Sequence, residues 1–203
     1  MKGSLFIVSA PSGAGKTSLV NALVQQEDNI VLSVSHTTRP ARVGEVDGKD
    51  YFFLSQEQFI QMQGKGEFLE SATVFDNSYG TSSLAVFEQL QQGNDVILEI
   101  DWQGAEQVRK NYAECIGVFI MPPSRAALEE RLRGRGQDDN EIIARRMKDA
   151  GNEMSHYIEF DYLLINDNFE QTLTELKTLI SAQRHKMTIQ AQVQESLLKE
   201  LLV

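Results

Sequence analysis

The chain has 203 residues, of which 41% are hydrophobic and 24% are charged. These values are ordinary for a folded globular protein, and the length predicts one domain, or one domain with a large insert. The formal net charge of −10 argues against nucleic acid and against an anionic membrane surface as partners, because both need a positive face. One cysteine makes no intrachain disulfide, and no apolar run is long enough to span a membrane. We therefore expect a cytoplasmic protein.

Short apolar runs alternate with helical patterns along most of the chain. Strands are predicted over residues 5–8, 30–34, 96–100, 116–121 and 162–165. Helices are predicted over residues 18–26, 103–110 and 124–133, and a long helical tail follows the last strand. Continuous apolar strands separated by helices are typical of a parallel sheet that is covered on both faces. The predicted fold class is therefore α/β.

Two regions interrupt this alternation. Residues 35–83 hold short alternating segments and several glycines, which predict a small mixed insert with one helix near residues 56–63. Residues 134–156 are polar and rich in arginine. Because neither region continues the pattern of the sheet, we expect both to be additions to the core.

The C-terminal tail carries an apolar stripe. From Leu173 onward, apolar residues recur near helical spacing at positions 173, 176, 180, 187, 197 and 201. We interpret the stripe as the face of a helix that packs on its own domain. A homo-oligomer formed through the C-terminal helix is the alternative, and glutamines at positions 183, 190 and 194 weaken it.

A glycine-rich loop stands between the first predicted strand and helix. Residues 9–17 read S-A-P-S-G-A-G-K-T and match the phosphate-loop pattern except that Ala10 replaces its first glycine. Gly13 and Gly15 let backbone N–H groups turn toward phosphate oxygens. Lys16 brings a positive charge to the β- and γ-phosphates, and the Thr17 hydroxyl can ligate Mg²⁺. The predicted triphosphate site comprises Ala10, Pro11, Ser12, Gly13, Ala14, Gly15, Lys16 and Thr17, with Mg²⁺ held at Thr17.

A second cluster follows the second strand. Arg39 and Arg42 lie three positions apart in a predicted loop, where both guanidiniums could clamp one phosphate group. Tyr51 could add a hydroxyl donor to the same group. A surface arginine taken alone is usually only a solvated charge, so the assignment depends on the combination of residues.

The phosphate loop and the stretch Ser35–Tyr51 are followed by further motifs, and together they resemble the guanylate kinase family. The further motifs are Tyr79-Gly80-Thr81, Asp101-Trp102-Gln103-Gly104, the segment 131–136 and Asn166-Asp167. The resemblance spans residues 4 to about 182. It implies a P-loop NTPase-type parallel sheet with a mixed α+β GMP-binding insert and a helical lid. The implied division is a core of residues 1–34, 84–125 and 157–203, an insert of 35–83 and a lid of 126–156.

The resemblance also implies a reaction and an acceptor site. The reaction is ATP + GMP ⇌ ADP + GDP in purine nucleotide metabolism, with dGMP as a further acceptor. The implied GMP-binding residues are Ser35, Arg39, Arg42, Tyr51, Glu70, Tyr79, Gly80, Thr81 and Asp101. Carboxylates at Glu70 and Asp101 can accept from guanine N1–H and N2–H₂, and a hydroxyl at Ser35 or Thr81 can donate to O6. Adenine lacks the N1–H donor, so a buried carboxylate would discriminate against it.

The family pattern further implies which groups neutralise charge in the transition state. These catalytic residues are Lys16, Arg39, Arg131, Arg135 and Arg146. Guanidiniums on a mobile lid close over both nucleotides and exclude water. We expect Arg133 and Arg145 to form ordinary surface salt bridges instead.

Two residues near strand ends are assigned less directly. Asn166 follows the last strand and matches the residue that the family places near adenine. Glu99 stands where the family more often has aspartate, which leaves open whether it serves the metal or the base.

Two other functions remain open at this point. The first is a related kinase with a different acceptor, such as another nucleoside monophosphate or a small metabolite. The second is a guanylate-kinase-like module that binds protein partners and has lost catalysis. The second is disfavoured, because the phosphate-loop lysine and threonine and the arginines of the pattern are all present.

Overall fold

The computed structural model describes residues 2–74, 76–134 and 140–202. Its main sheet has five parallel strands in the order β2-β7-β1-β8-β9. The strands are β1 (Leu5–Ser9), β2 (Ile30–Leu32), β7 (Asp95–Glu99), β8 (Ile116–Met121) and β9 (Tyr162–Ile165). All five predicted strands are confirmed. The second ends at Leu32 rather than at residue 34, because the chain leaves the sheet there to enter the insert.

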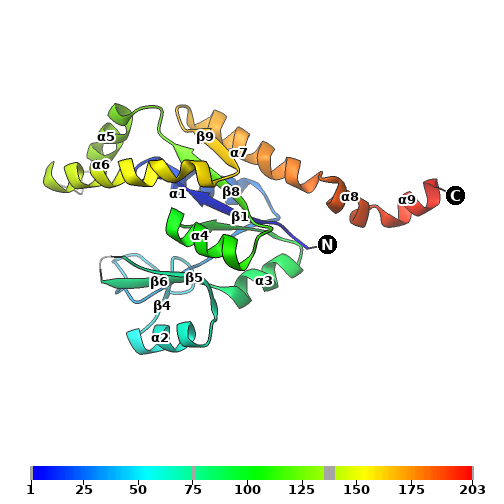
Figure 1. The fold of residues 1–203 in the computed structure, drawn as a ribbon, viewed down its shortest axis with the longest axis horizontal. Coiled ribbons are helices and arrows are strands. Elements are labelled where there is room, and N and C mark those ends of the chain that lie inside the picture. Colours follow the sequence, from blue (N-terminus) through cyan, green and yellow to red (C-terminus); the bar gives the residue numbers. More distant parts are fainter. Residues whose placement is uncertain (1, 75, 135–139, 203) are drawn as a thin grey trace.

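Helices cover both faces of this sheet (Figure 1). They are α1 (Lys16–Gln26), α3 (Ser83–Gln91), α4 (Trp102–Asn111) and α7 (Phe169–Arg184). Alternate side chains of the central strand divide between two cores. Phe6 and Val8 belong to the cluster that includes α1 and α7, whereas Leu5 and Ile7 belong to the cluster that includes α3 and α4. Burial on both faces explains why the strands read as continuous apolar runs.

The insert forms a second, mixed sheet in the order β4-β3-β6-β5. Its elements are β3 (His36–Thr37), β4 (Phe52–Phe53), α2 (Gln56–Gly64), β5 (Phe68–Val74) and β6 (Asn77–Ser82). Ser55 and Gln58 form a capping box at the start of α2, and Phe59 of that helix stacks on Phe68 with ring centroids 4.7 Å apart. The predicted helix is confirmed to within one residue.

Side chains of α4 hold the insert against the core. The amide of Gln107 accepts from the backbone N–H of Ser71 at 3.1 Å and donates to its carbonyl at 3.0 Å. Asn111 donates to the backbone carbonyl of Leu69 at 2.8 Å. These bonds extend from the helix that starts right after Asp101, so the position of the acceptor insert is linked to that end of the main sheet.

The polar region contains α5 (Arg125–Gly134) and α6 (Asn140–Ser155), followed by the 3₁₀ helix η1 (His156–Glu159). Leu128, Leu132 and Ala150 pack together between the two helices. A Cβ atom built at Gly13 would lie 3.0 Å from the side chains of both leucines. The first helix of the predicted lid, α5, therefore rests directly on the phosphate loop.

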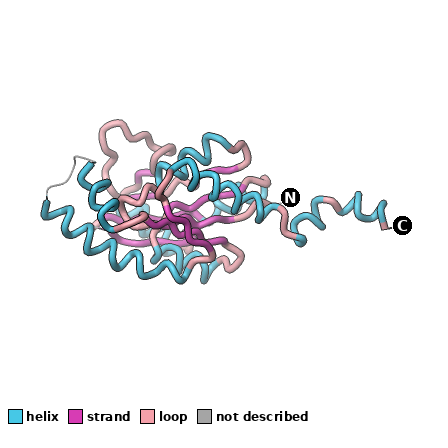
Figure 2. Tube along the Cα trace, turned by 90° about the horizontal axis from the view of Figure 1, so that it is seen from above, coloured by secondary structure: helices cyan, strands magenta, loops and turns pink. Residues whose placement is uncertain are grey.

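The C-terminal tail separates into a packed part and a projecting part. Leu173, Leu176 and Ile180 of α7 are buried, as the stripe predicts. The helices α8 (Met187–Val193) and α9 (Glu195–Leu201) extend away from the body in both views (Figures 1 and 2). Met187 is 79% exposed and Leu201 is 68% exposed. The prediction that the whole stripe packs on its own domain is wrong from position 187 onward, because α8 and α9 project beyond the body and have no part of the sheet to pack on. No helix in the described ranges combines the length and the apolar character needed to cross a membrane.

Candidate functional site

The loop between β1 and α1 has the backbone of a phosphate site. Gly13 and Gly15 adopt φ angles of +93° and +94°, a region that other residues rarely occupy. A Cβ at Gly15 would lie only 2.4 Å from Nδ2 of Asn166. That amide donates to the backbone carbonyl of Ala14 at 2.7 Å, and Asn166 is buried. The side chain that the family pattern assigns to adenine is thus seated beneath the loop and holds its shape.

Lys16 lies inside a cavity of about 300 Å³ that the loop forms with Glu99, Asp101 and Glu153. Its ammonium is 3.4 Å from the backbone carbonyl of Ile100. Burial lowers the pKa of Lys16, and the carboxylates of Glu99, Asp101 and Glu153 act in the opposite direction. A half-buried cation next to loop N–H groups and a helix N-terminus provides the electrostatics that a polyphosphate needs.

Thr17 and Glu99 meet in the same cavity. The Thr17 hydroxyl donates a hydrogen bond to the Glu99 carboxylate at the end of β7. The contact places Glu99 beside the phosphate loop. Both side chains offer oxygen atoms, the donor type that Mg²⁺ prefers, so this pair fits the predicted metal position.

The insert contains a buried carboxyl–hydroxyl pair. The Thr81 hydroxyl donates to the Glu70 carboxylate at 2.6 Å, and the two residues are 0% and 6% exposed. Burial raises the pKa of Glu70 to about 7, while the hydrogen bond from Thr81 opposes the rise and the charge of Asp101 adds to it. A Cβ at Gly104 would lie 3.1 Å from the other Glu70 oxygen, so this carboxyl group borders the first turn of α4.

Asp101 lies between the two halves of the site. One of its oxygens accepts from the Gly104 N–H at 2.8 Å and caps α4. Its charge affects the pKa values of both Glu70 in the insert and Lys16 in the phosphate loop. The carboxyl end of the main sheet therefore brings the predicted base-reading group and the predicted phosphate-binding group to one place, as expected for an open α/β sheet.

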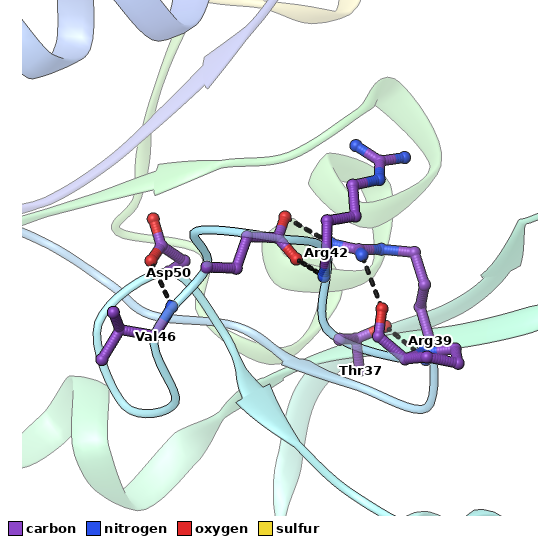
Figure 3. A network of polar contacts seen from close by, with 7 residues as sticks. Thr37, Arg39, Arg42, Val46 and Asp50 are labelled. Carbon is purple, nitrogen blue, oxygen red and sulfur yellow. Dashed lines mark hydrogen bonds and ion pairs between the residues drawn. The ribbon is translucent and has the colours of Figure 1, made fainter.

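The loop after β3 holds Arg39 in a network of polar contacts (Figure 3). Its guanidinium is 2.7 Å from Oε1 of Glu45 and also donates to the carbonyl of Pro40 at 2.7 Å. The other Glu45 oxygen accepts from the backbone N–H of Arg42 at 2.7 Å. The Arg42 guanidinium points away from this network in Figure 3. One carboxylate thus orients both predicted phosphate-binding arginines, Arg39 by its side chain and Arg42 by its backbone.

Two tyrosines complete this end of the site. The rings of Tyr51 and Tyr79 have centroids 6.1 Å apart and meet edge to face. The Arg39 guanidinium lies 5.4 Å from the centre of the Tyr51 ring. Burial raises the pKa of Tyr51 further above neutral pH, so its hydroxyl is a donor there. Gly80 pairs with His36 across β6 and β3, and Ser35 precedes β3 directly. The predicted GMP-binding residues of the insert therefore lie on or next to β3, β4, β5 and β6.

The predicted lid arginines lie in different settings. Arg131 donates to the backbone carbonyl of Asn166 at 2.8 Å, and its other terminal nitrogen is buried with no hydrogen-bond partner among the described residues. Arg146 is half-buried on α6. Arg135 falls outside the described residues. Arg133 pairs with Glu129 at 2.7 Å and Arg145 lies 3.9 Å from Asp149, which confirms both as surface ion pairs.

Sequence reasoning missed two carboxylates of the site. Glu45 lies inside the stretch that carries the family resemblance, so its position near two arginines could have suggested an ion pair. Glu153 has no such signal, because its contact with the N–H of Ser12 joins residues 141 positions apart.

A family model described as guanylate kinase matches residues 2–183. The chain belongs to the guanylate kinase family. It is 56% identical over 202 residues to the guanylate kinase of Alkalilimnicola ehrlichii, covering 100% of both chains. It is 51% identical to the guanylate kinase of Escherichia coli strain K12, covering 99% of this chain and 98% of that one. The crystal structure of a guanylate kinase from Anaplasma phagocytophilum superimposes with a TM-score of 0.75 at 34% identity, covering 92% of this chain and 88% of that chain. These relatives confirm the resemblance and the P-loop fold class.

Proposed function

We propose that this member of the guanylate kinase family transfers the terminal phosphoryl group of ATP to GMP, giving ADP and GDP. The observation that carries the proposal is the buried Glu70–Thr81 pair, which lies next to Asp101 and hence next to the phosphate loop. A carboxylate accepts from the adjacent N–H donors of guanine, and no other common nucleobase presents that pair of donors beside a carbonyl oxygen.

In this proposal some residues bind the nucleotides and others neutralise charge on the transferred phosphoryl group. Loop N–H groups and Lys16 hold the β- and γ-phosphates of ATP, while Arg39 and Arg42 hold the phosphate of GMP. Arg131, Arg135 and Arg146 bring further positive charge from the lid. Phosphoryl transfer needs little covalent chemistry from the protein, so we propose a direct in-line transfer without a covalent enzyme intermediate.

Mg²⁺ is the proposed cofactor, and Thr17 is the residue that holds it. When bound, the ion supplies positive charge to the phosphate oxygens of ATP. The Thr17 hydroxyl can bind the ion through its oxygen while its O–H still donates to the Glu99 carboxylate. Among the described residues, no three His, Cys, Asp or Glu side chains are grouped so as to hold a metal ion. Mg²⁺ usually keeps several waters and is bound through one or two protein groups plus substrate phosphates.

Further parts of the proposal concern organisation and acceptor range. The core comprises residues 1–34, 84–125 and 157–203, the GMP-binding insert 35–83 and the lid 126–156. We also propose dGMP as an acceptor, because the roles assigned above to the named side chains concern the base and the phosphate of GMP. The products belong to purine nucleotide metabolism. Location in the cytoplasm stays a prediction.

A panel of acceptors tests the reaction. ADP release is measured with GMP, dGMP, AMP, CMP and UMP, each with and without Mg²⁺. We expect Mg²⁺-dependent turnover with GMP and dGMP and little with the other three. Equal rates with AMP and GMP would contradict the base-reading role of Glu70 and favour a kinase with another acceptor. No turnover with any of them would favour a binding module.

We also propose that the projecting tail contacts a second copy of this chain. Leu197, Leu198 and Leu201 of α9 are 49%, 38% and 68% exposed, and the tail extends clear of the body. Sedimentation of a Leu198→Asp/Leu201→Asp variant is the test, with Leu84→Asp on α3, also exposed, as the matched control. The tail variant is expected to sediment as a monomer while the control remains oligomeric. A wild-type chain that sediments as a monomer would contradict the proposal.

A further inference from the structure

A carboxylate of the lid lies on the phosphate loop. Oε2 of Glu153, near the end of α6, accepts a hydrogen bond from the backbone N–H of Ser12 at 3.1 Å. Glu153 also lines the phosphate-loop cavity together with Lys16. Backbone N–H groups of such a loop bind anionic oxygens. The lid thus places an anion of its own where the loop binds phosphate.

The surroundings of Glu153 match those of a phosphate oxygen in this cavity. Burial raises the pKa of its carboxyl group, while the Ser12 N–H and the charge of Lys16 act to lower it. Asp101 and Asp149 add a smaller rise through their negative charges. The carboxylate is therefore attracted by the same donor and the same cation that attract ATP, and its nearest anionic neighbours repel it.

We propose that Glu153 is a positioning residue that competes with an ATP phosphate for the Ser12 N–H and must leave the loop when ATP binds. The proposal rests on the proposed function, because it assumes that the cavity receives the phosphates of ATP. Two anionic oxygens at one N–H donor repel each other in a half-buried cavity, which disfavours their binding there together. Binding of ATP therefore releases the end of α6 from the loop.

A second contact of the same segment transmits this release. His156, three residues after Glu153, stacks on Trp102 with ring centroids 3.5 Å apart and an interplanar angle of 6°. Trp102 is the first residue of α4 and directly follows Asp101. The end of α6 is thus attached to the phosphate loop through Glu153 and to the acceptor side through His156. Loss of the Glu153–Ser12 contact removes one of these two attachments and should alter the stacking of His156 on Trp102. ATP binding is thereby connected to the lid.

Calorimetric titration of Glu153→Gln tests the competition directly. The variant keeps an acceptor for the Ser12 N–H but removes the charge that repels phosphate. Its Kd for ATP, and for inorganic tripolyphosphate as a probe of phosphate alone, should fall about tenfold, whereas its Kd for GMP should stay within about twofold. Glu130→Gln on α5 is the matched control, because it removes the same charge from an exposed position of the lid. That variant should bind ATP like the wild type.

The outcomes separate the two proposals. Wild-type protein that binds no ATP would contradict the proposed function, whereas wild-type ATP binding with an unchanged or weaker affinity in Glu153→Gln would overturn the competition alone. A thermal melt shows that each variant is folded. The emission of Trp102, the one tryptophan of the chain, gives a second readout. ATP should change the emission of the wild type. Glu153→Ala should already show much of that change without ATP. If the emission of Glu153→Ala equals that of the ATP-free wild type, the link between Glu153 and the Trp102 contact is contradicted.

Discussion

Replacing Glu70 by glutamine should make the protein more stable and less active. The carboxyl group is 6% exposed, and its pKa rises from 4.5 to about 7 because of burial. The folded state therefore keeps a proton that the unfolded state loses as pH rises from 4.5 toward 7. Stability falls through that window and the loss is complete above about pH 7. At about 1.4 kcal/mol per pH unit, an ionised Glu70 costs the fold about 3 kcal/mol.

Glutamine removes this cost without removing the partner of Thr81, because its side-chain carbonyl still accepts the 2.6 Å hydrogen bond. Denaturant unfolding of the wild type and Glu70→Gln at pH 5 and pH 8 measures the difference. The variant should gain up to about 3 kcal/mol relative to the wild type at pH 8 and little at pH 5. Glu67→Gln is the matched control, since Glu67 stands just before the same strand but its side chain is 43% exposed, and it should change stability by less than about 0.5 kcal/mol.

Activity should change in the opposite direction. Each charge-assisted hydrogen bond to guanine is worth about 1.5–3 kcal/mol, so kcat/KM for GMP should fall by about 10- to 150-fold in Glu70→Gln. The KM for ATP should change little. A stability difference that is the same at pH 5 and pH 8 would refute the raised pKa. Unchanged kcat/KM for GMP would refute the base-reading role.

Three further substitutions test the rest of the site. Lys16→Met should lower kcat by more than about 100-fold in the ADP-release assay, since it removes charge from the transferring phosphates, while calorimetry should show unchanged GMP binding. Arg39→Ala should raise KM for GMP by about 10- to 150-fold, because it removes a charged phosphate contact; an equal rise in KM for ATP would contradict its place on the acceptor side. Gly15→Ala should lower Tm and weaken ATP binding, because alanine strains a φ of +94° and its Cβ would lie 2.4 Å from the Asn166 amide; a melt like that of the wild type would contradict the strain.

The parts of the site that could be predicted from sequence are those that depend on local backbone. A loop with glycines at positions 13 and 15, placed between a strand and a helix, predicts a backbone with positive φ angles, and both glycines have them. The contacts between Thr17 and Glu99 and between Ser12 and Glu153 join residues 82 and 141 positions apart. No periodicity or spacing reports such a contact, because the topology of the sheet and the packing of the lid bring those residues together.

In the C-terminal tail, too, the sequence predicts local structure but not packing. Its apolar stripe has helical spacing throughout, and this spacing correctly predicts helices. Leu176 and Leu201 fit that stripe equally well, yet the first is buried and the second is 68% exposed. Hydrophobic periodicity identifies the face of a helix that needs a partner. It does not say whether the sheet extends far enough to supply one.

The carboxylates around each phosphate site reconcile a net charge of −10 with two anionic substrates. Lys16 lies among Glu99, Asp101 and Glu153, and Arg39 is paired with Glu45. Lys16 and Arg39 therefore each have a counter-charge within the protein, which spares the fold the cost of an isolated charge. On the proposed function, an ATP phosphate exchanges with the Glu153 carboxylate at the phosphate loop. This exchange weakens absolute affinity, and it makes binding of ATP release a protein contact. That contact belongs to the lid, so part of the free energy of ATP binding is used to release the lid from the loop.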